Sequence, residues 1–154
     1  DTRNVTSMQA MFDKCYSLTD LNISNFDTSN VTTMAWMFAH VPATSLNVSG
    51  FDTSKVTDMK GMFIHCSNLT SLDLSGFNTS QVTTMRQMFQ NCESLTELDL
   101  CSFDTRKTTD FWGAFAYMFK VQYVLVGPNW TTANADTTNM FIGSRISSVT
   151  TGQC

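Results

Sequence analysis

With 154 residues, 42% of them hydrophobic, the chain is long enough for one domain with a buried core. Only 14% of the residues are charged, and Thr, Ser and Asn supply the remaining polarity, which suits the surface of an exported protein. The net charge of -4, with no basic cluster beyond Arg106 and Lys107, excludes nucleic-acid binding, and no apolar run approaches the roughly 18 to 20 residues of a membrane span.

One unit repeats along the sequence. A Met-Phe pair or a close variant recurs at steps of 26, 25, 26, 26 and 26 residues, and we number the units 1 to 6 by their phenylalanines: Phe12, Phe38, Phe63, Phe89, Phe115 and Phe141. We therefore predict a single repeat domain over residues 1-154, built from about six units of 25-26 residues. Residues 104-154 depart from the pattern of the earlier units, and we predict that they form a C-terminal cap.

Each unit divides into two segments with different periods. Around Leu98 and Leu100 apolar and polar residues alternate, which predicts a short strand. From Val82 to Cys92 the apolar residues are spaced at 0, 3, 6, 7 and 10, which predicts a helix of two to three turns. The predicted fold is an α/β solenoid, a right-handed leucine-rich-repeat-like coil with a parallel β-sheet on one face and short helical segments on the other.

Stacking of the units predicts a core made of columns of equivalent residues. The Met and Phe columns are interpreted as core packing rather than as a cofactor site, since Met fills gaps between coils. The two strand columns are Leu21, Leu46, Leu72, Leu98 and Val124, and Ile23, Val48, Leu74, Leu100 and Val126. After each strand, a triplet such as Asp52-Thr53-Ser54 is predicted to close a turn and to cap the helical segment through its short polar side chains.

The copies from Phe51 to Phe63 and from Leu69 to Phe77 closely resemble the 26-residue repeat of the BspA-like leucine-rich-repeat surface proteins. The resemblance implies a cell-surface or secreted location and, for some members, adhesion to host proteins or to other cells. A likeness of fold does not supply a ligand. From it we carry over the location and a binding role only.

The outward residues of the predicted strands form one long face, which open solenoids use as a platform for partners. We predict an extracellular adhesion or recognition module that binds a protein or glycan on another cell or matrix through this face, where an exposed Tyr lies beside a Leu. The predicted binding residues are Asp20, Asn22, Asn47, Asp73, Glu97, Asp99, Tyr123 and Leu125. The alternative is a structural spacer or assembly subunit that stacks through its ends on neighbouring domains or chains.

The sequence predicts no enzyme, no cofactor and no metal site. Asp73 and Asp99 occupy equivalent positions, so their backbones are expected to lie about 5 Å apart, where a calcium ion would relieve their repulsion. We favour solvated carboxylates, because few other oxygen ligands accompany them and a regular sheet face offers no cleft to raise one pKa. His40 and His65 are predicted to be plain loop histidines, since neither has a sequence neighbour that completes a triad or a metal set.

Five cysteines leave at least one unpaired within the chain. Cys15, Cys66 and Cys92 fill the same repeat position and are predicted to be buried free thiols, although Cys66 and Cys92 lie in adjacent units and could pair. A bond between Cys101 and Cys154 would require the C-terminal tail to fold back.

Overall fold

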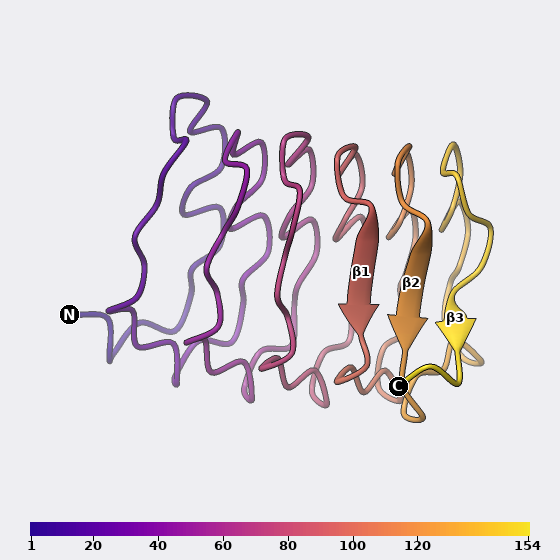
Figure 1. The fold of residues 1–154 in the computed structure, drawn as a ribbon. Coiled ribbons are helices and arrows are strands. Elements are labelled where there is room, and N and C mark those ends of the chain that lie inside the picture. The colour runs from indigo at the N-terminus through magenta and orange to yellow at the C-terminus, as the bar shows by residue number, and fades with distance from the viewer.

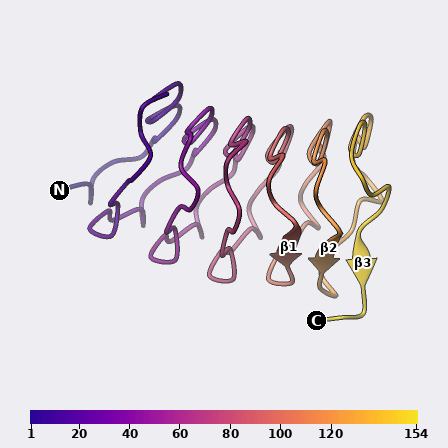
Figure 2. The same ribbon diagram turned by 45° about the horizontal axis from the view of Figure 1, so that its top comes forward.

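A computed structural model describes residues 1–154, whose successive turns are stacked as coils side by side from one end of the molecule to the other (Figure 1 and Figure 2). We call them coils 1 to 6, after the unit that each contains. Three short strands lie on one side of the last three coils and form a parallel sheet in the order β1-β2-β3. They are β1 (Glu97–Leu100), β2 (Tyr123–Val126) and β3 (Thr150–Thr151). The structure contains no helix, and so none that could cross a membrane.

The predicted α/β solenoid is therefore wrong, because none of the expected helical segments forms. Each coil instead has two residues with positive φ, four positions apart, in the segment predicted as a helix. A right-handed helix cannot pass through such residues, and L-residues adopt this conformation at a cost. These residues are Ala10 and Lys14, Trp36 and His40, Gly61 and His65, Gln87 and Asn91, Gly113 and Tyr117, and Asn139 and Gly143.

Backbone hydrogen bonds explain what replaces the helix. In coil 3 the amide of Phe63 donates to the carbonyl of Met88 in the next coil, at 3.0 Å. The amide of the preceding residue, Met62, donates within its own coil to Met59, three residues back. The same alternation runs through coils 1 to 5, so every second amide of the segment bonds the next coil. A helix would direct these amides along its own axis and leave the coils without this link.

The strands also differ from the prediction. A strand was expected in each unit, but coils 2 and 3 are joined on this side only by a bridge between Ser45 and Ser71. In the early coils the side chains of Asn22 and Asn47 accept hydrogen bonds from the backbone amides two residues on. Asp99 makes the same local bond within β1, so this bond alone does not prevent a strand, whereas the Tyr-Val-Leu-Val sequence of β2 strongly favours strand pairing.

The predicted core columns are largely confirmed. Leu98 pairs in register with Val124, and Leu100 pairs with Val126, with all four side chains buried. The six Met-Phe phenylalanines form one continuous stack, in which neighbouring ring centroids lie 5.8, 5.7, 5.8, 5.7 and 5.3 Å apart. In the strand column that contains Leu98, only Leu21 and Leu72 are half-buried.

A second ladder consists of buried threonines at the turn after each strand segment. The hydroxyl of Thr53 donates to the Asn78 carbonyl at 3.0 Å and accepts from the Asn78 amide at 2.8 Å, in the next coil. Thr28, Thr79 and Thr105 make the equivalent pair of bonds. The predicted turn closure is also present, because the Ser54 amide donates to the Asp52 carboxylate at 2.9 Å. The predicted role of these triplets as helix caps is wrong, since they cap no helix.

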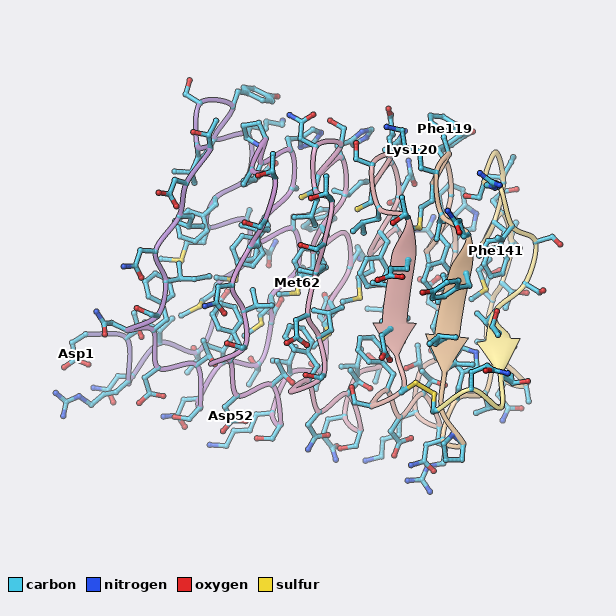
Figure 3. The ribbon with its side chains drawn as sticks, viewed as in Figure 1. Asp1, Asp52, Met62, Phe119, Lys120 and Phe141 are labelled. Atoms are coloured by element: carbon cyan, nitrogen blue, oxygen red, sulfur yellow. A yellow bond between two sulfur atoms is a disulfide. The ribbon has the colours of Figure 1, made fainter.

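The five cysteines differ in burial and in bonding. Cys66 and Cys92 are free and fully buried, as predicted, and burial raises the pKa of the Cys66 thiol to about 12. Cys15 is free but exposed, so the prediction that it is buried is wrong. The tail does fold back, and a disulfide joins Cys101 to Cys154 below the tips of β1 and β2 (Figure 3).

Substitution of Thr53 by Val tests the threonine ladder. The isosteric change removes the fully buried hydroxyl that bonds the Asn78 amide and carbonyl, so we expect a loss of about 1 to 3 kcal/mol in the free energy of unfolding. Thr57→Val is the control, because its hydroxyl bonds the Thr32 carbonyl from an exposed position where water substitutes. Urea unfolding measures both variants, and equal losses would contradict a special role for the buried hydroxyl.

Candidate functional site

A shallow depression of about 350 Å³ lies on the strand side of coils 3 to 5. Its walls are formed by residues at the strand positions of three successive coils, together with Thr70, which precedes these positions in coil 3. The lining residues are Thr70, Ser71, Leu72, Asp73, Glu97, Asp99, Tyr123 and Leu125. Three of the eight are carboxylates and none is basic, so the depression is an acidic surface with an aromatic edge.

The pairing of β1 with β2 positions one half of the depression. Glu97 lies opposite Tyr123, and Asp99 lies opposite Leu125, in a parallel register. Alternate side chains of a strand point to opposite faces, and Leu98 with Val124 occupies the core face. The four register partners are thereby left on the outer face, which is why the depression forms over these two strands.

Tyr123 and Glu97 are joined directly. The phenol hydroxyl of Tyr123 donates a hydrogen bond to Oε2 of Glu97 across the two strands. This bond raises the pKa of Tyr123 above its ordinary value, and loss of solvent and the negative charges of Glu97 and Asp99 act in the same direction. The ring of Tyr123 is therefore held in place by a carboxylate of the neighbouring coil.

The two aspartates are held by bonds to their own backbone. The amide of Ser75 donates to Asp73 Oδ1 at 2.9 Å, and the amide of Cys101 donates to Asp99 Oδ1 at 2.8 Å. Hydrogen bonds from Ser75 lower the pKa of Asp73, which keeps this carboxylate ionised in neutral solution. Each aspartate retains a second oxygen without a protein donor, available to hydrogen-bond donors of a ligand.

Five of the eight predicted binding residues lie together in the depression: Asp73, Glu97, Asp99, Tyr123 and Leu125. The other three, Asp20, Asn22 and Asn47, belong to coils 1 and 2 and do not line it. Sequence reasoning expected a face without a cleft, and it assigned Leu72 to the core. The sequence signal that could have indicated the depression is a change in side-chain size, because the small Thr70 and Ser71 come before the larger Glu97 and Tyr123 of the next coils.

The other polar groups include no cluster that could hold a metal ion. No group of three or more His, Cys, Asp and Glu side chains is close enough to hold a metal ion. The sequence did not predict that the His40 and His65 rings stack, with centroids 4.8 Å apart, nor that His40 Nδ1 lies 3.0 Å from Asp13 Oδ1. Burial, together with the nearby His40, lowers the pKa of His65.

The columns of equivalent residues and the regular bonds between coils define a repeat protein. Two overlapping segments of the chain, residues 1–71 and 40–150, match the family described as "Mycoplasma protein of unknown function, DUF285". Together they span most of the chain, which therefore belongs to this family. The overlap is what a repeated unit produces, since one coil can align with more than one part of a repeat family. No curated protein matches the chain, and no solved structure matches it.

Substitution of Glu97 by Gln tests the geometry of the depression. The change removes the charged acceptor, so we expect the raised pKa of Tyr123 to fall toward its ordinary value of 10.0. The measurement is an NMR titration of the tyrosine rings of the wild-type chain and the variant. The exposed Tyr16 is an internal control that should not respond, and an unchanged Tyr123 titration would show that the two side chains are not bonded.

Proposed function

We propose that this protein is an extracellular recognition module that binds a protein or glycan partner through the acidic depression. The observation that carries the proposal is the convergence of three carboxylates, a tyrosine and two leucines from three coils on one hollow of about 350 Å³. Carboxylate oxygens accept hydrogen bonds from sugar hydroxyls or from basic side chains. Tyr123 and Leu125 add apolar area of the kind that interfaces favour.

A location at the cell surface or outside the cell is part of the proposal. Disulfides persist in oxidising compartments, and the bond between Cys101 and Cys154 supports such a setting. The low fraction of charged residues points the same way. The resemblance of the copies from Phe51 to Phe63 to the BspA-like surface-protein repeat supports both the location and an adhesive role.

The role that we propose is binding without catalysis. In the depression, Asp73 accepts a hydrogen bond from the Ser75 amide, which stabilises its ionised form and lowers its pKa. General acid catalysis by a pair of carboxylates requires that one of them holds its proton near neutral pH. The lowered pKa of Asp73 is the opposite of this requirement.

Binding of purified variants to an array of immobilised glycans and extracellular-matrix proteins tests the proposal. We expect Tyr123→Ala and Asp99→Ala each to weaken capture of the wild-type ligand at least about tenfold, which corresponds to about 1.4 kcal/mol. Tyr123→Phe keeps the ring and removes only the bond to Glu97, so its loss should be smaller than that of Tyr123→Ala.

Asp58→Ala is the matched control. Asp58 accepts a hydrogen bond from the backbone amide two residues on, as Asp99 does. It pairs with Thr33 and Thr84, however, and does not line the depression. Its substitution therefore removes the same local bond without touching the depression. If the Asp58 and Asp99 variants bind equally well, or if Tyr123→Ala retains full binding, the depression is not the binding site.

A further inference from the structure

Two histidine rings lie against each other at one edge of the stack. His40 of coil 2 and His65 of coil 3 occupy the same repeat position, and their rings are stacked with an interplanar angle of only 12°. Neither residue lines the acidic depression. The pair is therefore a titratable cluster that the proposed binding role does not use.

The stacking of the two rings follows from the repeat. Both residues have positive φ, 63° at His40 and 57° at His65, so the backbone turns at the same point of both coils. The amide of His40 donates to the Ile64 carbonyl of coil 3 at 2.9 Å, which holds the two turns side by side. A charge on one ring is thereby placed next to the other, because the ring centroids are 4.8 Å apart.

The groups of coil 1 act on the His40 side of the pair. Asp13 lies there with its Oδ1 3.0 Å from Nδ1 of His40, and this carboxylate stabilises a positive charge on the ring. The Tyr16 ring meets His40 edge-on and brings no charge in neutral or mildly acidic solution. Lys14 occupies the histidine position in coil 1, so a doubly protonated pair would extend a column of like charges.

His65 bears the cost of a second proton. Partial burial, and then repulsion from His40, lower the pKa of His65 below its ordinary value of 6.5, and the attraction of Glu93 in coil 4 offsets only part of this. In the folded chain His65 therefore takes up its proton at a lower pH than in the unfolded chain. The unfolded chain binds more protons between these two values, so the fold loses stability as the pH falls below 6.5.

We propose that the stacked pair of His40 and His65 makes the junction between coils 2 and 3 acid-sensitive, so that a second proton on the pair loosens this part of the stack. In a repeat protein each coil is held by its neighbours, so repulsion at one junction acts there first. The same repeat position holds Asn91 in coil 4 and Tyr117 in coil 5, so the junction between these coils lacks the response. The acid response does not depend on the proposed binding of a partner.

Hydrogen exchange, followed by NMR at about pH 7.5 and about pH 5.0, tests the proposal in the folded chain. We expect the protection factor of the His40 amide, corrected for intrinsic exchange, to fall at least about threefold on acidification, a part of the tenfold that a full pKa unit gives. The Asn91 amide is the internal control, because it makes the equivalent bond to Ala116 at 2.9 Å and should change little. Equal changes at the two amides would contradict a response confined to the histidine junction.

Two variants show whether the pair itself is responsible. His65→Asn is the matched change, because Asn91 occupies this position in coil 4 with a φ of 59°. The variant should keep its fold, and its His40 amide should no longer lose protection at acid pH.

His40→Asn tests the same pair from the other side. Removal of the neighbouring imidazole should move the pKa of His65, measured by NMR titration of its ring, upward toward 6.5. The proposal is overturned by a His65 pKa that does not move, or by an acid response that persists unchanged in His65→Asn.

Discussion

The structure depends on one constraint, which is that alternate backbone amides of the segment predicted as a helix, residues 59–65 in coil 3, bond the next coil. Positive φ at two positions of each coil, such as Gln87 and Asn91, turns these amides out of the path of a helix. Their bonds fix the spacing between coils, and this spacing places the phenylalanine rings 5.3 to 5.8 Å apart. The buried threonine hydroxyls repeat the same link on the opposite edge. Local conformation, core packing and overall shape thus follow from a single pattern of hydrogen bonds.

The candidate site is a consequence of the same repetition. Equivalent residues of successive coils become neighbours in space, so acidic residues at one repeat position gather into a surface, as Asp73 and Asp99 do. The depression lies where the small side chain of Ser71 is followed in the next coils by the larger side chains of Glu97 and Tyr123. This increase in side-chain size at one repeat position makes the surface uneven.

The sequence predicted the features that depend on column identity. The period correctly predicted that Leu98 packs against Val124, and the predicted binding residues include all three acidic residues of the depression. It failed for the helical segments, because the apolar spacing from Val82 to Cys92 fits a run of turns as well as a helix. The missed signal was the Gly at position 61, where φ is 57° and an added Cβ would lie 2.3 Å from the Trp36 ring. The disulfide was left open because its formation depends on the path of the tail, which no repeat position fixes.

The central claim is that the Phe63 amide bonds the next coil rather than its own. NMR couplings transmitted through hydrogen bonds identify the acceptor directly, since they connect an amide nitrogen to the carbonyl carbon that accepts its proton. We expect a correlation from Phe63 to Met88, and equivalent correlations from Phe89 to Ala114 and from Phe38 to Met62. A correlation from Phe63 to Met59, four residues back in its own coil, would show a helix and contradict the account.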